Sequence, residues 1–198
     1  MTSIRTLTRD IVQGSLGFAL VSLVAFSVWA FGGKFFKMFG GQPLMYAAIA
    51  VVFLALSGLV LGSLAGGIGR FYKAFVPAFF LYSVLWCAAW FGLGGRTGEW
   101  LGAAIGCLGF TWVAMKILGS TRHWLVAAVL LFVLHTAGYF AGDWALHDVW
   151  LSPLHLDELS RADRAQAAII GKLCWGLFYG LGFGAGIGCV FHRARVGA

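Results

Sequence analysis

The feature that most restricts the fold of this chain is the recurrence of apolar segments, about 20 residues long, that contain almost no charged side chains. Backbone amide and carbonyl groups cannot reach water inside a bilayer, so such a segment must satisfy them within a helix. At about 1.5 Å per residue, each helix is long enough to cross a hydrocarbon core about 30 Å thick. We predict an all-α fold, a polytopic transmembrane helix bundle with six spans, at about residues 11–31, 44–66, 71–92, 100–118, 123–142 and 167–191.

The composition favours one integral membrane domain over residues 1–198. Apolar residues make up 61% of the chain and charged residues 11%, against about 25% charged residues in typical soluble domains. This leaves no stretch for a second, soluble domain. The N-terminal segment has basic residues followed by an apolar run, as a signal peptide does. However, the apolar run from Ile11 to Phe31 exceeds the usual length of about 7–15 residues, so we expect a retained first span.

The basic residues lie mostly in short connections, where they orient the helices and meet anionic lipid. The net charge of +7 therefore indicates contact with the lipid bilayer and not with nucleic acid. One predicted side carries Arg5, Arg9, Arg70, Lys73, Lys116, Arg122, Arg193 and Arg195, and the other carries Lys34, Lys37, Arg96, Arg161 and Arg164. Because the richer side faces the cytoplasm, we expect a multi-pass protein of the inner (plasma) membrane with both termini cytoplasmic.

Two connections on the predicted outer side suggest structure of their own. The first, Gly32–Pro43, places Phe and Lys between glycine pairs, which fits either a turn in the membrane interface or an extension of a neighbouring span. The longest, Asp143–Ala165, contains Ser152 followed by Pro153, a typical N-cap and first-turn pair. We expect a short outer amphipathic helix that starts at Pro153 and leads towards, or directly into, the last span.

Glycines spaced by four residues mark the second, fourth and sixth spans, and small residues at this spacing let another membrane helix approach closely. The predicted packing residues are Gly58, Gly62, Gly66, Gly102, Gly106, Gly176, Gly180, Gly184 and Gly188. One hypothesis is three similar hairpins with the glycine-bearing helices clustered centrally, and the alternative is chance among 29 glycines. Such rows would also serve a homo-oligomer or a partner in a membrane complex.

His135 is the most informative polar residue, because ionisable groups well inside a span are costly and often functional. It is a candidate proton relay or ligand-binding group, or an axial ligand of a haem or pigment. The alternative is a neutral histidine hydrogen-bonded to a neighbouring helix, for example through Thr136, Ser83 or a carbonyl group. Tyr139 lies one turn further along the same helix and joins the candidate ligand-binding or relay site.

Other candidates lie towards the predicted outer side. Lys172, about one turn inside the sixth span, is expected either to extend to the interface or to face a cavity and pair with Asp143, Glu99 or an anionic ligand. Asp143 and His147 are four residues apart and would share a helix face, and with His155 they form a candidate metal site. The alternative is that these residues lie in a flexible loop and bind no metal, because such loops commonly contain His and Asp.

The common catalytic signatures are missing from the sequence, which contains no GxSxG, HExxH, Walker A motif, Rossmann glycine motif or cysteine quartet. This favours a non-enzymatic protein without a cofactor. The predicted function is a small membrane permease, channel or binding component for a small neutral or lipophilic solute. The alternatives are an accessory or structural subunit of a larger membrane complex, and a haem- or pigment-binding protein or enzyme that uses His135.

Overall fold

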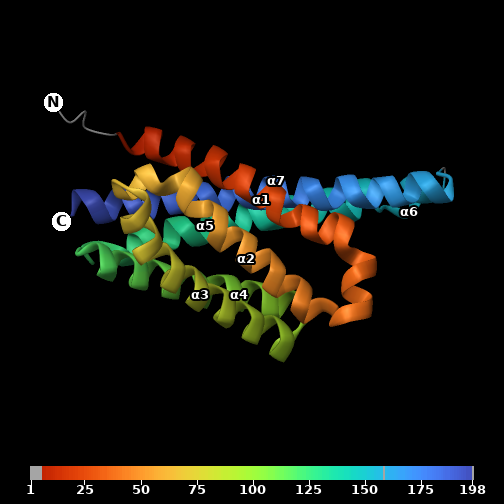
Figure 1. Ribbon diagram of the computed structural model, residues 1–198, viewed down its shortest axis with the longest axis horizontal. Coiled ribbons are helices and arrows are strands. Elements are labelled where there is room, and N and C mark those ends of the chain that lie inside the picture. The colour runs from red at the N-terminus through yellow and green to blue at the C-terminus, as the bar shows by residue number, and fades with distance from the viewer. Residues whose placement is uncertain (1–5, 158, 198) are drawn as a thin grey trace.

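A computed structural model describes residues 6–157 and 159–197, and nearly all of these residues are helical (Figure 1). In chain order the elements are α1 (Leu7–Phe39), α2 (Gly41–Leu61), the 3₁₀ turn η1 (Gly62–Ala65), α3 (Ile68–Leu93), α4 (Gly95–Leu118), α5 (Trp124–Trp144), the π-helical segment η2 (Ala145–Trp150), α6 (Pro153–Asp157) and α7 (Arg161–Val196). Within these described ranges, six helical segments are long and apolar enough to cross a membrane. The predicted all-α architecture with six candidate spans is confirmed.

Both termini lie at the same end of the bundle (Figure 1). An even number of crossings returns the chain to the side on which it started. We call the end that holds Leu7 and Val196 the proximal end, and the opposite end, with the turns at Gly40 and Gly94, the distal end. Which side of a membrane each end faces stays a prediction.

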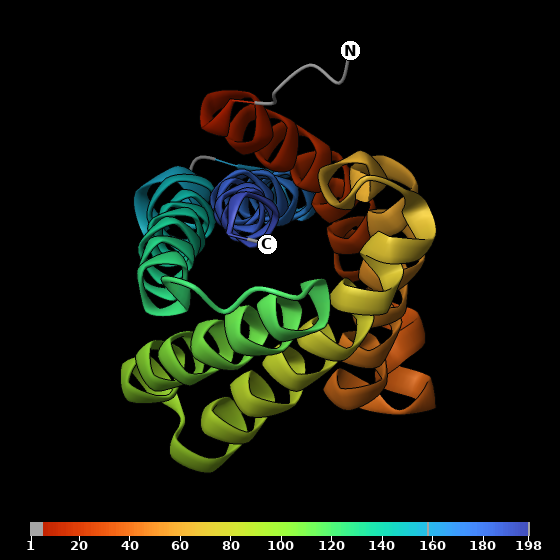
Figure 2. The same ribbon diagram turned by 90° about the vertical axis from the view of Figure 1, so that its left-hand side faces the viewer.

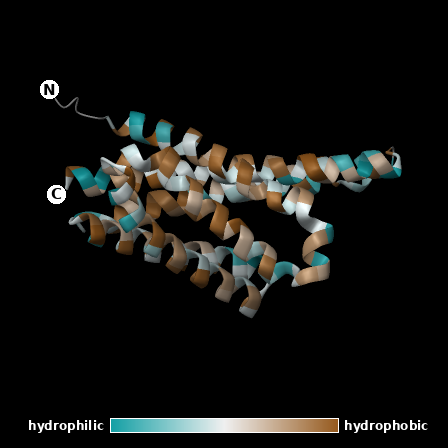
Figure 3. Ribbon diagram, viewed as in Figure 1, coloured by the Kyte–Doolittle hydropathy of each residue, from teal (hydrophilic) through white to brown (hydrophobic). Residues whose placement is uncertain are grey.

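The first and last helices extend beyond the predicted spans. α1 contains 33 residues and continues to Phe39, so the segment rich in Phe and Lys extends the first span and is not a separate turn. It ends where Gly40 and Gly41 adopt positive φ angles of 141° and 66°, which glycine reaches without strain. α7 contains 36 residues and begins beside Ser160, whose hydroxyl accepts a hydrogen bond from the Asp163 amide. Both helices exceed a core of about 30 Å, and hydrophilic residues lie at their outer ends (Figure 3).

The connection between α5 and α7 contains one short helix, α6. The amide of His155 donates to the Ser152 hydroxyl over 3.3 Å at the start of α6, as expected for a serine N-cap followed by Pro153. α6 ends at Asp157, and α7 begins at Arg161 with its own cap, so α6 does not run directly into the last span. Its placement in the membrane interface stays a prediction.

Phenylalanine rings fill the space that the helices enclose in Figure 2. Phe71 and Phe75 of α3 stack with their ring centroids 5.0 Å apart, and Phe71 also stacks on Phe191 of α7 at 4.9 Å. Phe18 of α1 meets Phe183 of α7 at 5.4 Å. All five side chains are at most 1% exposed. The proximal half of the bundle is therefore densely packed, as protein interiors are.

The glycines of α7 face two neighbouring helices. In the predicted row, a Cβ atom at three of the four glycines would lie 2.3 to 2.6 Å from backbone atoms of α1, and at the fourth 2.7 Å from the Phe26 side chain. These four are Gly176, Gly180, Gly184 and Gly188. Gly182, between them, would meet the Leu134 carbonyl of α5 at 2.3 Å. α7 thus lies between α1 and α5 with no room for side chains at these contacts (Figure 2).

The other glycine rows also face odd-numbered spans, so the rows do not meet at the centre and the three-hairpin hypothesis is wrong on this point. Gly58 and Gly62 approach side chains of α3, and Gly102 and Gly106 approach another part of α3. Gly66 is not a packing residue, because it ends η1 in a left-handed conformation with φ of 85°, and a Cβ atom there would meet nothing within 4 Å.

Candidate functional site

His135 lies in the middle of α5 and is completely buried. Its Nε2 atom lies 2.6 Å from the hydroxyl of Tyr82 in α3, and Tyr82 accepts a hydrogen bond of 3.4 Å from Tyr179 in α7. The expected hydrogen bond from His135 to a neighbouring helix is present, but its partner is Tyr82 and not Thr136, Ser83 or a carbonyl group. Tyr82 lies 53 positions earlier on another helix, so no local pattern in the sequence pointed to it.

The bond between His135 and Tyr82 can run in either direction, depending on the tautomer of His135. In one direction the Tyr82 hydroxyl donates its hydrogen to Nε2 of His135. A neutral imidazole that accepts at Nε2 carries its proton on Nδ1. That Nδ1 atom is buried and has no hydrogen-bond partner in the described part of the chain. A buried donor without a partner costs about 1–3 kcal/mol, so this N–H group would gain from a ligand.

Four aromatic rings surround the imidazole of His135. The Tyr139 ring lies nearly parallel to it with centroids 6.1 Å apart, and the rings of Tyr82, Tyr179 and Phe183 meet it at 5.3 to 5.6 Å. An axial ligand of a haem needs an imidazole nitrogen that is free to reach the iron. Nε2 is bound to Tyr82 and the other sides face closely packed rings, so these residues do not fit a haem or chlorin.

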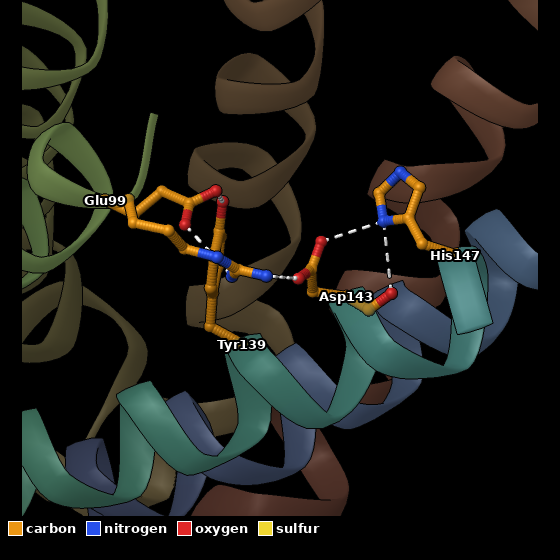
Figure 4. Close-up of polar contacts among 5 residues, drawn as sticks. Glu99, Tyr139, Asp143 and His147 are labelled. Atoms are coloured by element: carbon orange, nitrogen blue, oxygen red, sulfur yellow. Dashed lines mark hydrogen bonds and ion pairs between the residues drawn. The ribbon is translucent and has the colours of Figure 1, made fainter. Parts of the chain in front are cut away.

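A cluster of polar side chains lies closer to the distal end and joins α4 to α5 (Figure 4). We call Arg96, Glu99, Tyr139, Asp143 and His147 the distal cluster. Arg96 donates to Glu99 Oε2 over 3.1 Å and to Asp143 Oδ2 over 2.8 Å. Tyr139 donates to Glu99 Oε1 over 3.2 Å, and His147 Nδ1 lies 2.8 Å from Asp143 Oδ1. The guanidinium therefore bridges two carboxylates from different helices.

Sequence reasoning singled out three members of the distal cluster but placed the other two in a loop. Tyr139, Asp143 and His147 follow at intervals of four, which places them along one side of a helical segment. Arg96 and Glu99 were assigned to the connection, because the predicted fourth span began five residues after the true start of α4 at Gly95. A charged residue does not end this helix, because α4 continues through Arg96 and Glu99.

Of the three predicted metal ligands, Asp143 and His147 come together, but His155 does not join them. Among residues 6–157 and 159–197, no group of three His, Cys, Asp or Glu side chains is placed to hold a metal ion. His155 lies on α6 with its ring 5.9 Å from that of Trp150. Asp143 is paired with the cationic Arg96, whose charge opposes a second cation at the same carboxylate.

Lys172 takes no part in the distal cluster. Its ammonium lies 5.1 Å from the centre of the Trp29 ring, which is a cation–π contact. In the described ranges no carboxylate forms an ion pair with it, so neither Asp143 nor Glu99 is its partner. The contact with Trp29 accounts for its position between α1 and α7.

A second ionic cluster, absent from the sequence predictions, joins α1 to α7 at the proximal end. We call Asp10, His192 and Arg195 the proximal cluster. The side chain of Asp10 is fully buried, its Oδ2 lies 2.7 Å from His192 Nδ1, and it also accepts a hydrogen bond from Arg195. One signal was available: Asp10 is the single acid on a predicted side otherwise rich in basic residues.

Comparisons with known proteins give no relative, since no family model, characterised protein or solved structure matches this chain. The chemistry of the site therefore follows from its geometry. The site around His135 combines a buried imidazole nitrogen without a partner in the described part of the chain, aromatic walls and a polar cluster on the distal side.

Proposed function

We propose that this multi-pass membrane protein is a permease or binding component for a small neutral or lipophilic solute, which binds at His135 in the middle of the bilayer. The observation that carries the proposal is the buried Nδ1 atom of His135, which has no hydrogen-bond partner in the described part of the chain. With the proton on Nδ1, a small solute with a carbonyl oxygen or another uncharged acceptor would complete a hydrogen bond there once the closely packed rings around His135 separate to admit it. The aromatic walls favour an uncharged solute, because an ion would lose its hydration there.

The difference between the two halves of the bundle supports access from the distal end. Towards that end the aromatic side chains around the core are only partly buried, among them Trp29, Trp86 and Trp175. Towards the proximal end, Phe71 and Phe75 are completely buried and stacked. A solute would therefore reach His135 from the distal side, and its passage across the membrane would require the proximal rings to separate.

The proposal includes a location in the inner (plasma) membrane, with both termini in the cytoplasm and the distal end facing outwards. The excess of Lys and Arg in the proximal connections supports this orientation. The lipid bilayer is the partner that the apolar helices require. Assembly through the glycine rows loses its support, because the packing glycines of the described chain approach α1, α3 and α5 of the same molecule.

A matched pair of probes tests the proposed site. Acetophenone has a carbonyl acceptor, and ethylbenzene has nearly the same shape without one. A net hydrogen bond of about 0.5–1.5 kcal/mol predicts that the purified protein in detergent binds acetophenone about two- to tenfold more tightly. The measurement is the concentration dependence of the rise in the thermal unfolding temperature for each probe, since a ligand of the folded state stabilises it.

Two variants of His135 separate the hydrogen bond from the shape of the site. His135→Phe should bind both probes with equal affinity, because it has no donor. His135→Gln retains an N–H group and should restore part of the preference for acetophenone. Equal binding of the two probes by the wild-type protein, or an unchanged preference in His135→Phe, would contradict the proposal.

A further inference from the structure

A groove lies between α4 and α5 on the distal half of the bundle, outside the site at His135. Its volume is about 580 Å³, and it is wide open to the surroundings, so it is a shallow groove and not an enclosed cavity. Two of its lining side chains, Trp100 and Leu101, are 48% and 44% exposed. Since α4 is a candidate span, this exposed face meets lipid. The lining residues are Arg96, Thr97, Trp100, Leu101, Ala104 and Phe132.

Arg96 provides the charged group of the groove. Its side chain is 65% exposed, yet its guanidinium is held in place by two carboxylates and by the Phe140 ring, whose centre lies 5.0 Å from the guanidinium carbon. A guanidinium has about five N–H donors, and the bonds to Glu99 and Asp143 use two of them. The remaining donors are available to a phosphate, which arginine binds with paired hydrogen bonds.

The charges around Arg96 discriminate between classes of phospholipid. Glu99 and Asp143 both pair with the one guanidinium, so the carboxylates outnumber it by one. The surplus negative charge would repel a headgroup with a net negative charge. A zwitterionic headgroup has no net charge, and its ammonium would be attracted. We propose that the groove binds one zwitterionic phospholipid, with its phosphate on Arg96, its ammonium in the negative field of the two largely buried carboxylates and one acyl chain along the groove.

The length of the groove along α4 matches the thickness of one leaflet of a bilayer. From Arg96 to Ala104 the distance along an ideal helix is about 12 Å, and half of a typical hydrocarbon core is about 15 Å. The acyl chain would start at the distal interface, pass the Trp100 ring and end beside Phe132 of α5. A single chain would therefore fill the groove without crossing the midplane.

Native mass spectrometry of the detergent-purified protein tests this assignment. The probes are phosphatidylethanolamine and phosphatidylglycerol with identical acyl chains, added together in equal amounts. We expect one bound lipid per chain and a preference of about tenfold for phosphatidylethanolamine, because the surplus negative charge beside Arg96 disfavours an anionic headgroup. Equal or stronger binding of phosphatidylglycerol would overturn the proposed headgroup.

Three variants test the position of the lipid. Ala104→Leu fills the groove, keeps every charge and should reduce the bound lipid severalfold, whereas Ala47→Leu on the exposed face of α2 should leave it unchanged. Arg96→Lys keeps the charge but loses the paired donors to the phosphate, and it should weaken the binding of both lipids severalfold. Retention of the lipid by Ala104→Leu at the wild-type level would overturn the site.

Discussion

The two ionic clusters of this protein contain similar side chains but differ in burial. In the proximal cluster the side chains of Asp10, His192 and Arg195 are 0%, 15% and 33% exposed. In the distal cluster the two carboxylates are 10% and 13% exposed, but Arg96 is 65% exposed. The proximal carboxylate is therefore fully removed from solvent, whereas Arg96 of the distal cluster keeps access to water or lipid headgroups.

The helices that these clusters join also differ. α1 and α7 meet backbone to backbone, since a Cβ atom at Gly14 would lie 2.2 Å from the Gly184 carbonyl. α4 and α5 are separated on one side by a groove lined by Trp100 and Phe132. We infer that the proximal pair is the fixed part of the bundle and that the distal pair is where helices can separate. Both helix pairs contain an ion pair, so the ion pair does not tell a fixed pair from one that can separate. The packing of the helices beside the ion pair makes the difference.

The largest effect is expected at Asp10. Asp10→Asn removes a buried charge while its partners His192 and Arg195 remain, and breaking a buried ion pair typically costs about 3–5 kcal/mol. The measurement is the free energy of unfolding by SDS titration in mixed micelles. Asp148→Asn changes an exposed acid on η2 and serves as the control, with an expected change within about 0.5 kcal/mol. Equal effects in the two variants would show that the proximal cluster does not stabilise the fold.

The second effect concerns the contact between α1 and α7. The Cβ atom of Gly184→Ala would lie 2.3 Å from the Gly14 carbonyl, so the helices must move apart, and overpacking of this kind costs about 1–3 kcal/mol. Gly92→Ala in α3 is the matched control, because a Cβ atom there meets nothing within 4 Å and alanine favours a helix. The same SDS titration should show a loss of stability for the first variant and none for the second. The reverse order would mean that α1 and α7 are not in close contact.

The six spans could be predicted because a bilayer leaves the backbone few alternatives, but their ends could not. Charged side chains were taken as boundaries, yet Lys34 and Lys37 lie on the last turns of α1, and Arg96 lies on the first turn of α4. A helix that extends past the hydrocarbon core carries charges without cost, because its end reaches water or headgroups. The hydropathy of the sequence therefore defines the core of each span and not its ends.

The partners of the site residues were the harder part to predict. The position of His135 well inside a span was evident from the sequence, but its bond to Tyr82 depends on how α3 and α5 are placed. The glycine rows indicated close helix contacts without saying which helices meet. On α7, glycines at alternating positions serve α1 and α5 separately, and this division follows from packing in three dimensions.

The smallest effect is expected at Asp143, and its dependence on salt tests the contrast between the clusters. Asp143→Asn weakens a pair whose arginine is 65% exposed, and exposed pairs contribute about 0.2–1 kcal/mol. At 1 M salt the Debye length falls to about 3 Å, so the difference in unfolding free energy between the wild-type protein and this variant should shrink. The loss caused by Asp10→Asn should persist under the same conditions, because buried pairs are screened much less. If Asp143→Asn destabilises the protein as much as Asp10→Asn, and independently of salt, then both ends of the bundle are equally fixed and the distal pair is not the place where helices separate.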